Sequence, residues 1–570
     1  MNASSPQGND CHLSTKSYFV CGLIILFVGL IAAIILLASV PPVDRDSLTH
    51  HLYIPRLYLN HGGIFEIPEI DFSYFPMNLE MLYMLPLAFG NDIIPKYIHF
   101  LFALLTSAFL YYYIKVILNR TAALIGVLFF LSLPVIVKLS ITAYVDLGLI
   151  FFSSASLLLI FTWLKDTARV RYLLLAGACC GMAVGTKYNG LIDLLLLTMF
   201  VPVLYQRCSP QDKQSNVNAF RYGTVFFMAA LLTFSPWAIR NSIWTGNPLY
   251  PLFGSIFGTE DTSVLGGMNF FLVRKFLYHE SWWQTLLIPL RIFFEGQDDN
   301  PKYFDGQLNP FLLILPLFAF TVHARNNQEH IAKQTLAIFS FLYIILAFFQ
   351  RDLRIRYIGP AIVPLVILSI YGFNNVLILA KKIQKTNVRR FVFTILVLVA
   401  GAALLYNVFY ISSLFSKVQP LTYLSGKTSK TDYISHFRPE YPVYQYANQH
   451  LSNNSKTLCV FSGNRGYYLN IPHSFDFHNN QSILCNTIKR ASTPADILIY
   501  LQQNGFTHLI IRNDLWQQWL ANNLSTEKRV LFERVRSNNF HHMFSYDQYS
   551  LYEIHSSPQP SQINPGKETP

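Results

Sequence analysis

Long apolar runs, separated by short polar segments, occupy the first three quarters of the chain. The first run extends from Tyr18 to Val40, follows Lys16, and is not followed by a small-residue cleavage site. It is longer than the apolar part of a signal peptide, so we expect an uncleaved signal anchor with residues 1–17 in the cytoplasm. Further apolar runs lie at about 93–114, 121–138, 143–164, 172–187, 189–206, 222–239, 308–322, 334–349, 356–380 and 391–414. The sequence therefore predicts about eleven membrane spans within residues 18–415.

The connections between these runs alternate in length and charge. Every second connection is short and basic; these carry Lys115 and Arg120; Lys165, Arg169 and Arg171; Arg207, Lys213 and Arg221; Arg325 and Lys333; and Lys381, Lys382, Lys385, Arg389 and Arg390. Segments 41–92, 240–307 and 416–570 all fall on the opposite side. Because basic loops stay in the cytoplasm, the long segments are predicted to be external, in the periplasm of a cell whose inner membrane holds the chain.

Composition agrees with a multi-span membrane protein. Of 570 residues, 52% are hydrophobic and only 13% are charged, whereas soluble domains carry about 25% charged residues. This excludes a disordered chain, a coiled coil and an ordinary soluble enzyme. The net charge of +12 is explained by the basic loops and by anionic lipid, so we expect the bilayer as a partner and no nucleic acid.

Residues 416–556 differ from the rest, because they are polar and contain no run of membrane length. Strand-like segments at Thr457–Phe461, Ile497–Tyr500 and His508–Ile511, with a helix over Val443–Leu451, predict a small external α/β domain. Its two cysteines, Cys459 and Cys485, either pair in an oxidising compartment or stay as buried thiols. Residues 557–570 are predicted to be a disordered tail.

The first external segment contains a predicted interfacial helix. Leu48, Leu52, Pro55 and Leu59 share one face, and Gly62–Gly63 supply a stop. Asp44 and Asp46 lie at its N-terminal end, where the first span leaves the membrane. Asp46 is either a general base for an attacking hydroxyl or simply the cap of this helix.

Other carboxylates and histidines are placed to assist Asp46. Asp146, a further catalytic candidate, begins the fourth span at the external end, where it orients an acceptor, binds a cation or simply faces headgroup water. His50 and His51 follow Asp46 by about one helical turn. Glu80 lies later in the first segment, and we expect it to be solvated at the surface. Together these residues form a candidate acceptor side of the site.

Cations at the same depth are candidate ligands of a phosphate. Lys187 lies between glycines at the end of the fifth span, Arg240 ends the seventh, and Arg354 and Arg356 lie in an external turn. Basic residues on the external side run against the positive-inside rule, so they favour a functional role over a role in topology. Arginine also binds phosphate bidentately. For Arg351, in the same turn, we expect a pair with Asp352 or with lipid headgroups and no role as a phosphate ligand of the site.

Several well-known motifs are absent from the sequence. It contains no Walker A loop, no nucleotide-binding GxGxxG, no HExxH and no Cys/His cluster of zinc spacing. We therefore expect no nucleotide hydrolysis.

The chain resembles the GT-C glycosyltransferases, in particular the family-39-like group of protein O-mannosyltransferases and aminoarabinose transferases. The matching segments occur in order: DSLTHHL at 46–52, FPMNLEMLYMLPLAFG at 75–90, YVDLGL at 144–149, GTKYNGL at 185–191, RN and GNPLYP within 240–251, RIRYIGP at 354–360 and GFTHLII at 505–511. Many members have Asp-Glu where this sequence has Asp46-Ser47, so any role of that glutamate, including contact with a metal, is missing here. The resemblance implies no metal, and we expect no cofactor.

The resemblance implies an all-α polytopic bundle with its active site on the external face. It also implies a polyprenyl-phosphate-linked sugar as donor, inverting transfer to a glycan, lipid or protein acceptor, and the first-loop aspartate as base. That residue is Asp46, with Asp44 as the alternative. Two other interpretations stay open from the residues alone: a transporter or flippase of a lipid-linked saccharide, and an O-antigen polymerase or ligase-like enzyme.

Overall fold

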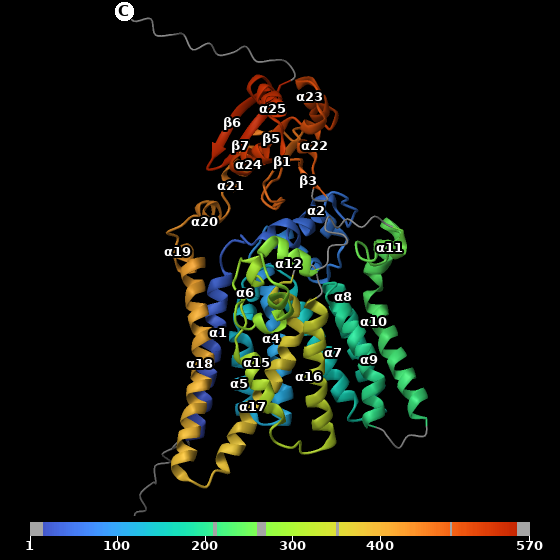
Figure 1. Cartoon of the computed structure of the whole chain (residues 1–570), viewed down its shortest axis with the longest axis vertical. Helices are drawn as coiled ribbons and strands as arrows, with labels where there is room; N and C mark the ends of the chain where they lie inside the picture. The colour runs from blue at the N-terminus through green and yellow to red at the C-terminus, as the bar shows by residue number, and fades with distance from the viewer. Residues whose placement is uncertain (1–14, 209–213, 259–269, 349–352, 479–480, 556–570) are drawn as a thin grey trace, which may run out of the picture.

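A computed structural model describes residues 15–208, 214–258, 270–348, 353–478 and 481–555. The chain forms a bundle of long helices with a small α/β domain at one end (Figure 1). We call this end of the bundle the domain side. The first loop, which contains α2, lies between the helices and the domain.

Each of the eleven predicted apolar runs is helical. Within the described residues, eight helices are long and apolar enough to cross a membrane; these are α1 (Thr15–Ala38), α4 (Ile94–Ile117), α7 (Asp146–Trp163), α9 (Gly190–Cys208), α10 (Ser215–Thr245), α16 (Asn327–Phe348), α17 (Gly359–Lys381) and α18 (Thr386–Val418). The other three runs differ from simple spans. One is α5 (Arg120–Ser132) and α6 (Pro134–Ser140), bent by 65°. The last two are short: α8 (Val170–Thr186), and α15 (Phe311–Ile314) with η4 (Leu315–Phe320).

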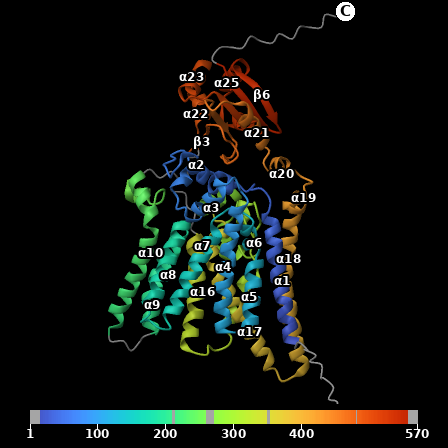
Figure 2. The same ribbon diagram turned by 180° about the vertical axis from the view of Figure 1, so that it is seen from behind.

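The connectivity agrees with the predicted alternation of loops. The short basic connection between α17 and α18 lies at the end of the bundle opposite the domain (Figure 1). The long segments lie on the domain side. Both views place α1 beside α18 at one edge of the bundle and α10 at the other (Figures 1 and 2). The chain is thus a multi-pass membrane protein.

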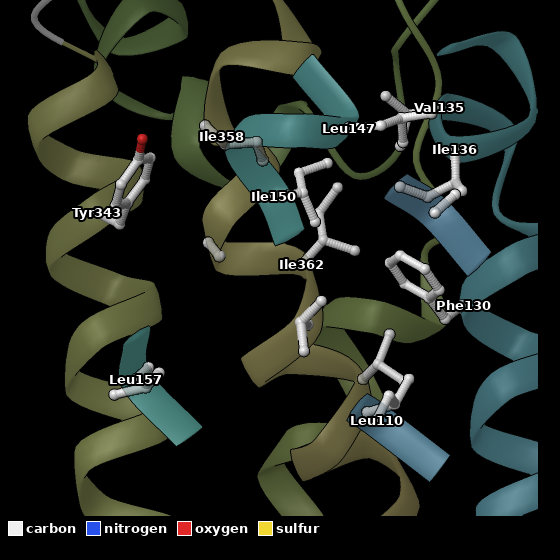
Figure 3. Close-up of a cluster of buried hydrophobic side chains, with 14 of the residues drawn as sticks. Leu110, Phe130, Val135, Ile136, Leu147, Ile150, Leu157, Tyr343, Ile358 and Ile362 are labelled. Carbon is white, nitrogen blue, oxygen red and sulfur yellow. The ribbon is translucent and has the colours of Figure 1, made fainter. Parts of the chain in front are cut away.

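The bundle is held together by a continuous apolar core. Side chains from α4, α5, α6, α7, α16 and α17 interdigitate in it (Figure 3). Leu110, Phe130, Ile136 and Ile150 have no exposed surface. Gly126 lets α5 approach α17 closely, because a Cβ there would lie 3.2 Å from Ile370 and 2.6 Å from Ile114. The helices that surround the site are therefore rigidly packed.

The first loop folds as four short helices on the domain side; these are η1 (Ser47–His51), α2 (Tyr53–His61), η2 (Asp71–Tyr74) and α3 (Asn78–Ala88). The predicted interfacial helix is confirmed, with one turn of π-helix at its start. It ends at Gly62, whose φ of +83° is a left-handed conformation that suits glycine. The π turn is notable because such turns are frequent at functional sites.

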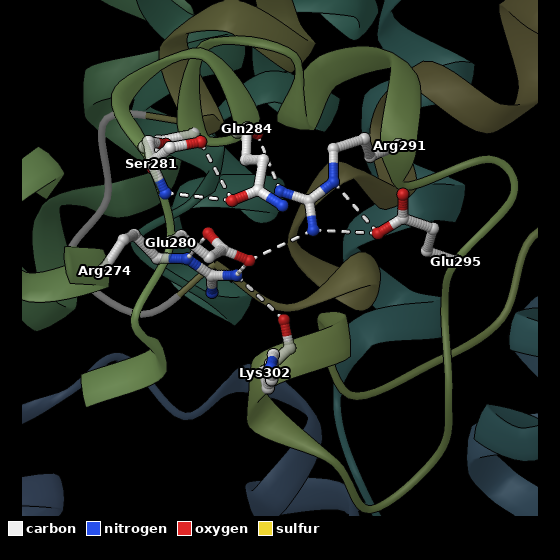
Figure 4. A network of polar contacts seen from close by, with 8 residues as sticks. Arg274, Glu280, Ser281, Gln284, Arg291, Glu295 and Lys302 are labelled. Atoms are coloured by element: carbon white, nitrogen blue, oxygen red, sulfur yellow. Dashed lines mark hydrogen bonds and ion pairs between the residues drawn. The ribbon is translucent and has the colours of Figure 1, made fainter. Parts of the chain in front are cut away.

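A second long loop on the domain side carries five short helices; these are α11 (Gly254–Phe257), α12 (Phe270–Tyr278), α13 (Trp282–Leu286), α14 (Ile288–Arg291) and η3 (Pro301–Tyr303). A buried ion network holds it together (Figure 4). Arg274 donates two hydrogen bonds of 2.8 Å to Glu280, which also accepts one of 3.0 Å from Arg291. Arg274 further donates to the carbonyl of Lys302 at 2.8 Å. The network thereby fixes the segment that leads to Phe304 and Asp305.

The C-terminal domain is connected to α18 by α19 (Pro420–Leu424) and α20 (Lys430–Phe437). The helix α18 continues to Val418, so the expected boundary near Ser416 falls in its last turn. A five-stranded sheet has the order β2-β1-β5-β7-β6; its strands are β1 (Thr457–Val460), β2 (His473–Phe475), β5 (His508–Arg512), β6 (Phe540–Tyr546) and β7 (Tyr549–Ile554). β1 is parallel to β2 and β5, whereas β7 is antiparallel to β5 and β6. A hairpin of β3 (Phe477–His478) and β4 (Gln481–Ser482) lies outside this sheet.

The two faces of the sheet are covered by different helices. α21 (Tyr441–His450) packs on one face, and the other is covered by α22 (Ile483–Arg490), α23 (Pro494–Gln503), α24 (Asn513–Asn523) and α25 (Thr526–Asn539). The predicted helix and two of the three predicted strands are confirmed. The strand expected at Ile497–Tyr500 is wrong: this segment lies in α23, which begins with a capping box at Thr493 and Asp496. Its short apolar run lines one helix face instead.

The open question about Cys459 and Cys485 is resolved by the alternation of side chains along β1. Cys459 points to the face covered by α21, while Leu458 and Val460 point to the face that holds Cys485. Both are buried free thiols. The tail expected to be disordered, 557–570, lies outside the described residues.

Candidate active site

A cavity of about 1060 Å³ lies on the domain side of the bundle. The first loop, the end of α8, the start of α9, the turn η5 (Ile355–Ile358) before α17 and the C-terminal domain line it together. Seven of the predicted site residues line it, all charged or titratable and drawn from three separate regions of the chain: Asp46, His50, His51, Glu80, Lys187, Arg354 and Arg356. The topology thus gathers residues that are more than 300 positions apart.

Asp46 forms an ion pair with Arg356. The guanidinium Nη2 of Arg356 donates to Asp46 Oδ2 at 2.6 Å, and Arg354 Nη1 lies 3.8 Å from the same oxygen. The alternative role of Asp46 as a helix cap is wrong, because its side chain accepts no hydrogen bond from the N–H groups of η1. Burial by itself raises the pKa of Asp46, but Arg356, with His50 and His51, outweighs burial and holds the pKa well below its usual range.

The segment that carries the two arginines is held by the second long loop. Ile355 N donates to Phe304 O at 2.8 Å, and Arg354 Nη1 lies 3.3 Å from Asp305 Oδ2. Arg356 is 8% exposed, and its guanidinium lies over the rings of Tyr144 and Tyr357 at 4.8 and 5.6 Å. The cation is therefore fixed in position before any ligand binds. Arg351, also considered from the sequence, lies outside the described residues.

Lys187 is another cation that lines the cavity. It follows α8, and its Nζ donates to Asp146 Oδ1 at 2.6 Å and lies 4.8 Å from the ring of Tyr357. Asp146 begins α7 and is completely buried, which overturns the expectation that it faces headgroup water. Because Asp146 lies behind Lys187 and outside the described lining, it positions the ammonium group and does not itself face the cavity.

Glu80 and His51 form a buried pair at the cavity wall. His51 Nδ1 lies 2.8 Å from Glu80 Oε1, and the two residues are 6% and 3% exposed. The expectation that Glu80 is solvated at the surface is wrong, because α3 turns this residue inward. Burial raises the pKa of Glu80 to about 8, and burial together with His50 lowers the pKa of His51 well below its ordinary value. Both side chains are consequently neutral near pH 7.

His50 joins the pair to an aromatic surface. Its ring stacks on Phe72 with centroids 4.2 Å apart and planes inclined by 13°, and its Nδ1 shares a 2.8 Å hydrogen bond with Thr49 Oγ1. Burial, with Arg356 and Lys187, lowers the pKa of His50 to about 4 although Asp46 opposes the shift. His50 is therefore an uncharged neighbour of Asp46 at neutral pH.

Three predicted residues are not brought to the cavity, as far as its lining is described. Asp44 and Arg240, like Asp146, lie outside it. Arg240 donates to the carbonyls of Tyr74 and Phe75 at 2.7 and 3.1 Å, and its guanidinium lies over Trp237 at 4.6 Å. It thus braces the first loop from α10, a structural role that its place at the end of a span did not reveal.

Sequence reasoning missed the residues that the C-terminal domain contributes. Phe461, Asn464, Phe475 and Leu515 line the cavity, although they lie in a domain whose function was undefined. No motif marks them, since they are turn and strand-end residues of ordinary composition. Two acids of the first loop, Glu69 and Asp71, also line it. Among the described residues, no group of three or more His, Cys, Asp or Glu side chains is placed to hold a metal ion.

These features define a polytopic membrane protein with the GT-C fold: a helix bundle, an acid–arginine pair that joins the first loop to the turn before α17, and a domain covering the site. Residues 88–240, which include Asp146 and Lys187, match the family model for dolichyl-phosphate-mannose-protein mannosyltransferases. No curated protein matches the chain in sequence.

Solved structures of this fold align over nearly the whole chain. The structure of ArnT from Cupriavidus metallidurans bound to undecaprenyl phosphate aligns over 96% of this chain and 100% of that one, with a TM-score of 0.57 and 16% identity. The same protein in the apo state gives a TM-score of 0.53, 16% identity, and coverages of 95% and 99%. The Archaeoglobus fulgidus oligosaccharyltransferase in the apo form gives 0.50, 12% identity, and coverages of 94% and 75%.

Proposed function

We propose that this protein is an inverting glycosyltransferase that uses a polyprenyl-phosphate-linked sugar as donor. The observation that carries the proposal is the Asp46–Arg356 pair at the wall of a large cavity, with Lys187 nearby. A carboxylate beside fixed cations suits a reaction in which a hydroxyl attacks and a phosphate leaves. The structural similarity to ArnT, solved with undecaprenyl phosphate, supports a lipid phosphate as leaving group.

In the proposed reaction the acceptor hydroxyl attacks the anomeric carbon of the donor sugar. Asp46 accepts the hydroxyl proton, a new C–O bond forms, and the bond between the anomeric carbon and the phosphate oxygen breaks. Polyprenyl phosphate leaves with the electron pair of that bond. Arg356 and Lys187 stabilise the negative charge that develops on the phosphate.

The ion pair has a consequence for when Asp46 becomes basic. Bound to Arg356 alone, the carboxylate is a weak base, because the cation favours its ionised form. A donor phosphate that shares Arg356 reduces this effect, so donor binding activates the base. The site would then be reactive only when the donor is in place.

The cavity lies on the domain side, opposite the short basic loops. By the positive-inside rule we propose that this side faces the periplasm and that the inner membrane holds the bundle. The donor is then presented from the outer leaflet.

The test is transfer of labelled sugar from polyprenyl-phosphate donors in membranes that contain wild type or Asp46→Asn. We expect the substitution to reduce transfer by about 10²–10⁴-fold, the range of a lost general base. Asp44→Asn is the matched control, two residues away and outside the described lining. Equal transfer by wild type and Asp46→Asn, at equal abundance, would exclude Asp46 as the base. Transport of the lipid-linked sugar across vesicles without transfer would favour the transporter interpretation.

A further inference from the structure

The C-terminal domain faces the cavity with the carboxyl ends of its parallel strands. Phe461 and Asn464 follow β1, Phe475 ends β2, and Leu515 follows β5 at the start of α24; all four line the cavity. In sheets with parallel strands, ligands bind at the carboxyl ends of the strands, at the point where the connections from two adjacent strands lead to opposite sides of the sheet. β1 lies between β2 and β5 and is parallel to both, so this edge is the expected ligand edge of the domain.

Specific contacts hold the connection between β1 and β2 over the first loop. Arg56 donates to Tyr467 O at 2.6 Å and to Asn470 Oδ1 at 2.8 Å. Tyr53 OH lies 2.8 Å from Nε2 of His473, the first residue of β2, whose ring is oriented by a second hydrogen bond from Nδ1 to Ile471 O at 2.8 Å. Since Arg56 and Tyr53 lie on α2, directly after η1 and Asp46, the chain that leaves the carboxyl end of β1 and enters β2 is fixed relative to the proposed base.

The side chains between this edge and the first loop are aromatic, amide and acidic. Phe461 and Phe475 come from the domain, and Phe72 comes from the first loop, where it is 43% exposed and supported by His50. Flat apolar rings fit the C–H faces of sugar rings. The amide of Asn464 and the carboxylate of Glu69 are hydrogen-bond partners for hydroxyl groups.

The charged groups of the cavity do not select an anionic acceptor. Arg356 and Arg354 lie against Asp46, and Lys187 is paired with Asp146. Arg45, Glu69 and Asp71 add charges of both signs to the lining. The aromatic rings and the amide of Asn464 therefore determine the class of acceptor, and they favour one that is uncharged and rich in hydroxyls.

We propose that the ends of β1, β2 and β5 form the acceptor subsite and that the acceptor is a neutral saccharide, which presents one hydroxyl to Asp46. The location of the acceptor reaction rests on the proposed function, but saccharide binding at this edge does not. The C-terminal domain is thus the element that determines the acceptor class.

The test uses the full-length chain in lipid nanodiscs and a printed array of neutral glycans, phosphorylated glycans and serine- or threonine-containing peptides. The neutral glycan captured most strongly is then titrated against wild type, Asn464→Gly and Phe72→Leu. Glycine keeps the left-handed backbone of Asn464, whose φ is +57°, and leucine keeps the apolar volume of Phe72. We expect each variant to weaken binding by about tenfold.

Tyr546→Leu is the matched control, because Tyr546 is a 45% exposed aromatic residue on β6, outside the described lining. We expect it to bind the glycan as wild type does, and all three variants to unfold at the wild-type temperature. Capture of phosphorylated glycans or peptides alone, capture of no glycan, or binding as strong as that of wild type by both cavity variants would overturn the proposal. Binding of polyprenyl phosphate to the same preparation is measured separately. If polyprenyl phosphate does not bind, the proposed donor is wrong, but the glycan titration still decides whether the strand ends bind a saccharide.

Discussion

Arg356 Nη2 donates to Asp46 Oδ2 at 2.6 Å, across 310 positions of the sequence. The bond connects the first loop to the turn before α17, two elements that are each fixed by their own packing. Because Arg356 is almost fully buried, removing either partner leaves the other charge with a large desolvation cost. The pair therefore controls the charge state of the proposed base and joins two walls of the cavity.

The first prediction concerns the pH dependence of transfer. With Arg356 present, the pKa of Asp46 lies well below its usual range, so Asp46 stays ionised and wild-type transfer shows no loss from this group down to about pH 5. In Arg356→Gln the largest charge that opposes burial is gone, so the pKa of Asp46 rises. We expect transfer by the variant to fall as the pH decreases through this higher pKa, measured as kcat against pH.

Arg356→Lys separates charge from geometry. Lysine keeps a cation but lacks the planar fork of arginine. We expect it to retain the low pKa of Asp46 while losing part of the phosphate stabilisation, so its kcat falls without a new acid limb. An acid limb that is identical in wild type and Arg356→Gln would contradict the coupling.

The second prediction concerns Lys187 and Asp146. Asp146→Asn leaves the ammonium group of Lys187 without its carboxylate, and breaking such a pair costs about 3–5 kcal/mol when fully buried. Lys187 is partly accessible, with an 18% exposed side chain, so a smaller loss is expected. The thermal unfolding temperature of the detergent-solubilised protein measures it.

The double variant Asp146→Asn/Lys187→Met distinguishes stability from catalysis. Removing both charges should restore much of the unfolding temperature, since no unpaired charge is left. Transfer should stay low, because the cation facing the cavity is missing. Recovery of full transfer in the double variant would show that Lys187 does not act on the donor phosphate.

The third prediction follows from the raised pKa of Glu80, about 8 in the fold against an ordinary value near 4.5. Between these two values the folded protein binds a proton that the unfolded chain has released, so the stability decreases as the pH rises. Glu80→Gln cannot ionise and removes this loss. We expect its unfolding temperature, relative to wild type, to increase from about pH 5 to about pH 8.

Glu66→Gln is the control for Glu80→Gln, because Glu66 is an exposed carboxylate on the same loop that accepts a 2.6 Å hydrogen bond from Tyr74. It should not reproduce the pH-dependent gain. If Glu80→Gln followed the wild-type curve at every pH, the buried and protonated state of Glu80 would be excluded.

The fourth prediction concerns the ion network of the second loop. Glu280→Gln removes the charge that holds Arg274 and Arg291, and we expect a destabilisation of about 3–5 kcal/mol. Transfer should also fall, because the same loop supplies the carbonyl of Phe304 that binds Ile355 beside the arginines. Hydrogen exchange of the segment after η3 should increase. The exposed pair Arg169–Asp166, 57% and 48% exposed, is the control: Asp166→Asn should change stability by less than about 1 kcal/mol.

Local pattern was sufficient to predict much of the fold. Apolar runs, basic loops and the glycine stop at Gly62 depend on residues close together in the sequence, and the structure confirms the helical runs, the interfacial helix and the alternating sides. The count of about eleven spans was too high: eight helices of the described residues are long and apolar enough to cross a membrane, or nine if the bent pair α5–α6 is one span. The strand expected at Ile497–Tyr500 was also wrong. Its apolar run suits one helix face as well as a strand, and the capping box at Thr493 and Asp496 favours the helix.

The candidate site depended on tertiary structure. The sequence by itself identified Asp46, Lys187 and Arg356, because charged residues next to membrane spans are costly and therefore informative. It could not tell that Asp46 pairs with Arg356 instead of capping a helix, that Glu80 is buried or that Arg240 braces a loop. These outcomes depend on which distant surfaces meet when the bundle packs, and no local periodicity encodes that. The strand ends of the C-terminal domain reach the cavity for the same reason.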